Sequence, residues 1–292
     1  MKYEPNKLHE YIRGSELRIV NDNFKIRLSP ELAKIYDAGD YDSDIATHAG
    51  YIDDIKALGI KYPGNANPVF YMYVVPDENF VELLSFPFPD RKGGGRPIKC
   101  LDLDGFNYAY GRSHNCLYNK SAQKDISRRV NGIHELAHLV HSQFWSCNRV
   151  LSEGFAEVLP LYTMGLEEKF YEHREIIRGM TPEDIIPPQE LLSMDRDGSF
   201  GRDVVPGKSC SLRLSYISSY LFVRGYVAAI ARKFGLDRAR ATQKFLEIVR
   251  SSGASYQFLI FDLADAVGMS GEEVLNSKNL QLAAHSQIVA QN

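Results

Sequence analysis

The chain has 292 residues and a formal net charge of −3, and 44% of its residues are hydrophobic and 24% are charged. This composition is ordinary for a globular protein with enough chain for one large domain or two lobes, and the charge gives no reason to expect nucleic acid or an anionic membrane as a partner. No apolar run is expected to span a membrane, and the start, Met1–Pro5, lacks the apolar core of a signal peptide. We therefore expect a cytoplasmic protein, with an exported protein that has lost its leader as the alternative.

The first half of the chain is predicted to be rich in strands. Residues Phe24–Leu28 alternate between apolar and basic side chains, and Pro68–Pro76 is rich in aromatic and β-branched residues. Two more strands are expected at Ile98–Tyr110 and Asn115–Tyr118, and a helix is expected near residues 41–58.

A helix with the metal-binding pattern HExxH is predicted next, since apolar residues recur around it at intervals of three and four. These residues are Ile126, Val130, Ile133, Ala137, Val140 and Phe144. His134 and His138 lie beside this stripe four residues apart, so their imidazoles share one face of the helix and can bind one metal ion. Glu135 lies between them, where it can accept a proton from a water molecule that zinc activates. The pattern predicts one Zn²⁺ per chain, with Glu135 as the general base.

The cysteines do not suggest a second metal centre. Cys100, Cys116, Cys147 and Cys210 form no CxxC pair, so neither a zinc ribbon nor a thioredoxin-type motif is expected. Reduced thiols are the simplest interpretation, and disulfides stay open if the protein is exported.

A second motif, SEGFAE at Ser152–Glu157, follows the HExxH helix. Together the two motifs resemble the gluzincins, the metallopeptidases that include thermolysin, the aminopeptidase N family and the clostridial collagenases. In that group HExxH is followed by a helix that carries a glutamate ligand, often within NEGFA or EEGxAE. The resemblance covers roughly residues 120–280 and rests on these two motifs.

The resemblance implies a third zinc ligand and leaves two candidates for it. By residue match the ligand is Glu153, and Glu157, one helical turn on, takes the position that hydrogen-bonds a ligand histidine. Residues 139 to 156, 18 in number, separate His138 from Glu157, which is the spacing that aminopeptidase N relatives use for the ligand itself. The glutamate helix is expected to bend or end near Leu159, because Pro160 cannot donate a backbone hydrogen bond.

The resemblance also implies a tyrosine whose phenol stabilises the oxyanion of the reaction. Tyr216 opens an apolar stretch predicted to be a helix that runs to about Phe234 and ends at Gly235. Tyr216 matches the leading position of this helix, and Tyr220 is the alternative.

We therefore expect an α+β protein with a zincin-like fold. Residues 1–145 would form a strand-rich N-terminal lobe with a mixed sheet and the HExxH helix, and residues 146–292 a helical lobe with the third ligand. The expected function is zinc-dependent hydrolysis of peptide bonds in a peptide or protein substrate, with the oligomeric state open. One alternative is a zincin-like binding or scaffold protein without turnover. Another is an aminopeptidase, although the Gly-x-Met-Glu-Asn signature of that subfamily is missing before HELAH.

Overall fold

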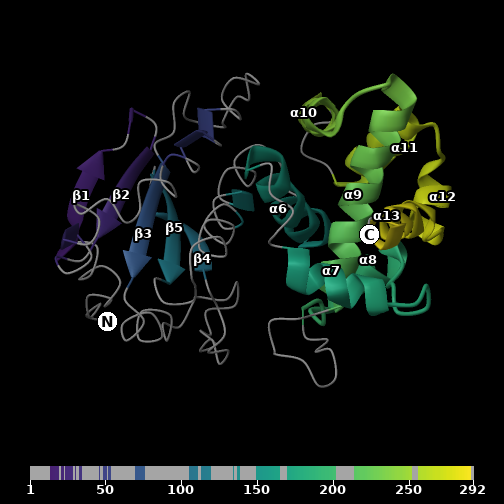
Figure 1. Ribbon diagram of the computed structural model, residues 1–292, viewed down its shortest axis with the longest axis horizontal. Coiled ribbons are helices and arrows are strands. Elements are labelled where there is room, and N and C mark those ends of the chain that lie inside the picture. Colours follow the sequence, from purple (N-terminus) through teal and green to yellow (C-terminus); the bar gives the residue numbers. More distant parts are fainter. Residues whose placement is uncertain are drawn as a thin grey trace. The chain divides into compact units, whose positions relative to one another are not determined.

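The computed structural model describes residues 14–19, 21–22, 24–28, 30, 33–34, 46, 49–50, 52–53, 70–75, 105–110, 113–119, 134, 137–138, 149–164, 170–201, 214–251 and 256–290. The chain forms two compact units, Met1–Asp53 with Gly64–Leu139 and Asp54–Pro63 with Val140–Asn292. The first unit contains the strands and the second the long helices (Figure 1). The described part of the chain is therefore α+β.

The strands of the first unit form one mixed sheet. They are β1 (Glu16–Ile19), β2 (Phe24–Leu28), β3 (Phe70–Val75), β4 (Gly105–Tyr110) and β5 (Ser113–Asn119). Their order in the sheet is β1-β2-β3-β5-β4. Strands β2, β3 and β5 run parallel to one another, whereas β1 and β4 run antiparallel to their neighbours. Strands β1 and β4 are thus the two edges of the described sheet.

Strand β2 shows how its sequence sets the two faces of this sheet. Phe24, Ile26 and Leu28 are buried, whereas Lys25 and Arg27 are half-buried. Alternate residues of a strand point to opposite faces, so the apolar residues of β2 lie on the core side. The predicted strand is confirmed with the same bounds.

The other predicted strands are confirmed with shifted ends. Strand β3 lies inside the predicted segment Pro68–Pro76, which fits because a proline cannot donate to the hydrogen bonds of a sheet. Strand β4 is the second part of the predicted segment Ile98–Tyr110, whose first part lies outside the described residues. Strand β5 extends the prediction at both ends, and the described residues within 41–58 are helical. Strand β1 was not predicted.

The second unit is built from helices in the part that the structure describes. They are α6 (Arg149–Met164), α7 (Phe170–Gly179), α8 (Pro188–Asp197), α9 (Leu214–Phe234), α10 (Arg238–Ser251), α11 (Tyr256–Val267), α12 (Gly271–Asn276) and α13 (Asn279–Ala290). Helices α6, α8, α10, α11 and α13 all pack against α9.

Helix α9 is the core helix of this unit. Its buried residues lie all around the helix and include three serines, Ser215, Ser218 and Ser219. By length and composition alone α9 would also suit a membrane span, although most of the helix is buried inside the protein. The expectation that no apolar run spans a membrane stays a prediction. The surrounding helices account for the composition, because a helix covered on every side is apolar on every side.

Two close helix crossings depend on glycines. A Cβ atom at Gly154 of α6 would lie 2.3 Å from the carbonyl oxygen of Ser219 in α9. A Cβ atom at Gly225 of α9 would lie 2.3 Å from the carbonyl oxygen of Leu280 in α13. Both distances are far below a normal contact, so only glycine lets these backbones approach so closely.

Hydrogen bonds between buried groups join α9 to α13. The Ile186 backbone N–H donates to Ser218 Oγ at 3.0 Å. The Gln281 side-chain amide donates to the carbonyl oxygens of Ile186 at 2.8 Å and Ser218 at 3.0 Å. These bonds connect α13 with α9 and with the segment that leads into α8.

The predicted helix ends were right for α9 and wrong for α6. Helix α9 ends at Phe234, and Gly235 follows with a φ of 64°, the left-handed conformation that favours glycine. Helix α6 continues through Pro160 to Met164, so of the predicted bend or end near Leu159 the end is wrong and the bend stays a prediction. A proline inside a helix removes one backbone hydrogen bond, and the packing of α6 against α9 offsets this loss.

Candidate metal centre

His134 and His138 form a close imidazole pair. Both residues are helical and half-buried, and Ala137 between them is fully buried, which agrees with the predicted helix whose apolar stripe faces the core. Their Nε2 atoms lie 3.0 Å apart, and the ring planes are nearly perpendicular at 83°. Residues four apart on a helix are neighbours on one face, so the sequence spacing accounts for the pairing.

The distance between the two nitrogens fits a shared zinc ion. Two nitrogen ligands about 2.05 Å from one zinc ion, at a tetrahedral angle, lie about 3.3 Å apart. The observed 3.0 Å is within a few tenths of an ångström of this value. The same distance also suits a hydrogen bond in which one imidazole donates to the other, so the pair alone does not identify a metal.

Glu153 is the third ligand that the SEGFAE motif implies. It is half-buried on α6, which belongs to the second compact unit, whereas His134 and His138 belong to the first. Two imidazoles and one carboxylate are a ligand set of catalytic zinc sites, which leave a position open for water or substrate.

Buried neighbours on α6 fix the position of Glu153. Val150, Phe155 and Ala156 are buried, and Gly154 packs directly on the α9 backbone. The glutamate therefore projects from a helix whose other face is held in the core.

Glu157 lies one turn further along α6 and has a different setting. Its charge acts on the phenol of Tyr220 in α9, whose pKa is raised from its ordinary value first by burial and further by this carboxylate, whereas Arg224 and Arg238 lower it. The Arg224 guanidinium also donates a hydrogen bond to the Tyr220 hydroxyl.

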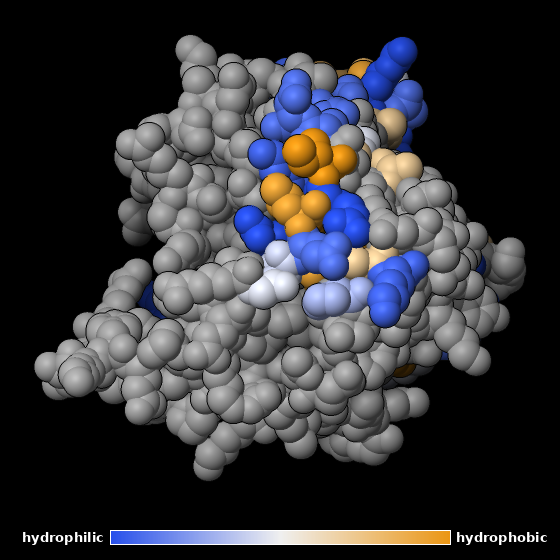
Figure 2. Space-filling view, turned by 90° about the vertical axis from the view of Figure 1, so that its left-hand side faces the viewer, coloured by the Kyte–Doolittle hydropathy of each residue, from blue (hydrophilic) through white to orange (hydrophobic). Residues whose placement is uncertain are grey.

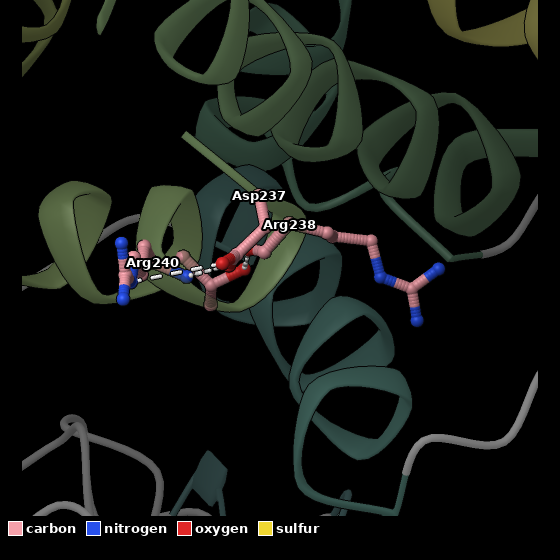
Figure 3. Close-up of polar contacts among 4 residues, drawn as sticks. Asp237, Arg238 and Arg240 are labelled. Carbon is pink, nitrogen blue, oxygen red and sulfur yellow. Dashed lines mark hydrogen bonds and ion pairs between the residues drawn. The ribbon is translucent and has the colours of Figure 1, made fainter. Parts of the chain in front are cut away.

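Arg238 belongs to the first turn of α10. The Asp237 carboxylate accepts a hydrogen bond from the backbone N–H of Arg240 at 2.8 Å and so caps this helix. Figure 3 shows Asp237 turned toward Arg240, while the side chain of Arg238 extends away from both. Arg238 thus adds to the positive charge that Arg224 supplies near Tyr220.

Tyr216 is half-buried in the first turn of α9, and a residue that the sequence analysis did not single out holds it there. Arg149 Nη2 donates to the Tyr216 hydroxyl at 3.4 Å, and Arg149 Nη1 donates to the Phe200 carbonyl oxygen at 3.2 Å. The Phe200 ring lies 5.3 Å from the guanidinium and 5.5 Å from the tyrosine ring. Arg149 precedes Glu153 by four residues on α6, but this spacing does not indicate its contacts to residues 51 and 67 positions away.

The two tyrosine candidates differ in their surroundings. The Tyr220 hydroxyl is buried and engaged by Arg224, which does not suit a group that must reach a substrate. Tyr216 keeps part of its surface exposed. Glu135, the predicted general base, lies outside the described residues.

Comparison with known proteins adds no assignment. No model of a protein family matches the chain. No curated protein matches it. The resemblance to gluzincins therefore rests on the HELAH and SEGFAE motifs.

Proposed function

We propose that the chain is a zinc-dependent metallopeptidase that hydrolyses peptide bonds, with a zincin-like arrangement of the gluzincin type. The observation that carries the proposal is the pair of His134 and His138, whose imidazole nitrogens lie 3.0 Å apart, a distance compatible with a shared zinc ion. The SEGFAE motif supports Glu153 as the third ligand by residue match.

The proposed reaction divides its work among three groups. Zinc, when bound, supplies a Lewis acid that polarises the scissile carbonyl and makes water more acidic. Glu135 accepts the proton of the attacking water and later delivers it to the leaving amine. The Tyr216 hydroxyl donates a hydrogen bond to the oxygen on which negative charge develops. Arg149 can only donate to this phenol, so that contact does not use the hydroxyl proton of Tyr216.

The first experiment measures metal content. The purified chain, without added metal, is expected to hold close to one zinc per chain by mass spectrometry. Replacing His134 or His138 with Ala should remove it, since each supplies one of three protein ligands. A chain that takes up no zinc even after reconstitution would refute the site and the hydrolase proposal together.

A pair of matched variants separates the two glutamates. Glu153→Gln should abolish stoichiometric zinc binding, whereas Glu157→Gln should keep the stoichiometry and weaken affinity by about 10–100-fold, as loss of a hydrogen bond to a ligand does. Glu190→Gln, at an exposed position of α8, is the control and should bind zinc as the wild type does. The reverse result for the first two variants would make Glu157 the ligand.

Turnover is tested with internally quenched peptide libraries. Glu135→Gln should bind zinc normally and lose activity by about 10²–10⁴-fold. If this variant keeps full activity, the general-base role is wrong. If zinc binds and no peptide is cleaved by the wild type, the alternative of a binding or scaffold protein replaces the peptidase. Comparison of substrates with free and blocked N-termini distinguishes an endopeptidase from an aminopeptidase.

A further inference from the structure

Strand β1 forms an edge of the described sheet and carries apolar side chains on its exposed face. Leu17 is 39% exposed and Ile19 is 68% exposed. Glu16 and Arg18 lie on the other face, half-buried, with 2.9 Å between a carboxylate oxygen and a guanidinium nitrogen. Figure 2 shows this side of the molecule, where exposed hydrophobic residues lie among hydrophilic ones.

An edge strand of this kind is suited to pairing with another strand. Edge strands that must stay alone usually carry charged residues, prolines or bulges where another strand would approach. In β1 the exposed positions are Leu17 and Ile19, and every residue pairs in unbroken register with β2. The strand has no proline and no bulge, and its two charged residues, Glu16 and Arg18, have opposite signs, so a second strand can complement them.

We propose that β1 pairs antiparallel with β1 of a second copy of this chain, about a two-fold axis perpendicular to the sheet. Directly opposed residues of an antiparallel pair point to the same face, so the two residue numbers must both be odd or both be even. One such register places Leu17 opposite Leu17 of the second copy. It also places Glu16 opposite Arg18 of the second copy, and by symmetry Arg18 opposite Glu16.

This register is favoured because the strand is complementary to itself. Each acidic residue meets a basic one, and the two Leu17 side chains lie against each other with Ile19 on the diagonal, within reach of both. The next permitted register opposes Arg18 with Arg18 of the second copy, and like charges directly opposite destabilise a strand pair. The charge order of β1 thus selects one pairing, and the second copy is the partner that supplies its complement.

The test measures the mass of the full chain over a range of concentrations by sedimentation equilibrium or light scattering. The wild type should form a dimer with a measurable Kd. Each single reversal, Glu16→Arg or Arg18→Glu, should raise this Kd about tenfold or more, because the symmetry places two like-charge pairs in the dimer. The double variant Glu16→Arg with Arg18→Glu should restore the wild-type Kd. Glu247→Arg, the same charge change at an exposed position of α10, is the control and should leave the Kd unchanged.

Three results would overturn the proposal. The first is a wild type that stays monomeric throughout, which would mean that β1 is covered by another part of the chain or by another protein. The second is a dimer that the single reversals do not weaken, which would place the interface elsewhere. The third is a double variant that does not recover although its circular dichroism matches the wild type. None of these measurements depends on zinc or on peptide hydrolysis.

Discussion

Replacing Gly154 with alanine tests the helix crossing that holds the glutamate motif in place. The added methyl group would lie 2.3 Å from the Ser219 carbonyl oxygen, 2.7 Å from its carbonyl carbon and 2.8 Å from Val223 Cγ2. A normal contact to an oxygen is about 1 Å longer than the first of these distances. Two of the three atoms are backbone of a buried helix, so α6 must move away from α9.

The cost of this movement can be estimated from general values. Overpacking a core costs about 1–3 kcal/mol, and a backbone obstacle places this site at the upper end. Alanine offsets about 1 kcal/mol of this cost, because it is a better helix former than glycine. The expected net loss is about 2 kcal/mol in the free energy of unfolding, or a decrease of about 4–8 °C in Tm for a unit of this size.

Urea and thermal denaturation followed by circular dichroism measure this loss. Gly225→Ala should destabilise to a similar degree, since its methyl group would meet the Leu280 carbonyl oxygen at 2.3 Å. Gly179→Ala is the control, because no atom lies within 4 Å of an added Cβ there, and it should be neutral or slightly stabilising. If Gly154→Ala unfolds at the same urea concentration as the control, the crossing is looser than described and the reasoning fails. Zinc affinity adds a second readout, and of the two crossing variants only Gly154→Ala should weaken it.

Three further predictions concern contacts within the helical unit. Arg149→Met should lower the free energy of unfolding by about 1–2 kcal/mol, through loss of the bonds to Phe200 and Tyr216; unchanged urea unfolding would contradict this. Tyr220→Phe should lose less stability than the wild type above pH 10. The pKa of Tyr220 in the folded protein is raised from its ordinary value of 10.0. Its contribution to stability is therefore complete below pH 10.0 and is lost as the pH rises through the folded value. A wild type and variant with parallel stability curves between pH 9 and 11 would count against it. The pKa of the Asp184 carboxyl is lowered from its ordinary value of 3.8, first by the Thr181 backbone N–H, then by the Thr181 hydroxyl and more weakly by Lys278. Its stabilising effect is therefore present above pH 3.8 and is lost as the pH falls through the lowered value. Carbon-detected NMR titration should show a higher Asp184 pKa in Thr181→Val, and an identical value would refute the role of the hydroxyl.

The parts of the fold that follow from local pattern could be predicted from the sequence. Strand β2 alternates strictly, and α9 is long, apolar and closed by a glycine, so both were predicted with nearly the right bounds. The extension of α6 through Pro160 was not predictable, because tertiary packing against α9 decides it. Strand β1 was missed for a related reason, since it is short and its apolar residues are exposed.

The candidate site divides in the same way. The histidine pair follows from a spacing of four residues on one helix, whereas Glu153 is proposed as a ligand by residue match to a known motif. The role of Arg149 could not be read from the sequence, because its contacts to Phe200 and Tyr216 join residues 51 and 67 positions away. The close approach at Gly154 was likewise invisible, since a helix pattern does not show which backbone lies opposite a glycine.

The burial of α9 has a consequence for how the helical unit is made. The helix meets α6, which precedes it, at Gly154 and meets α13, which follows it, at Gly225. Contacts between residues so far apart in sequence form late, because a long loop must close before they contribute any stability. During synthesis α9 therefore leaves the ribosome with one apolar side uncovered, and that side stays exposed until α13 has also been translated. A ribosome that stalls between these two helices would expose the apolar side of α9 to chaperones and to other chains. The rate of translation through α10 to α12 is therefore expected to affect the yield of folded protein.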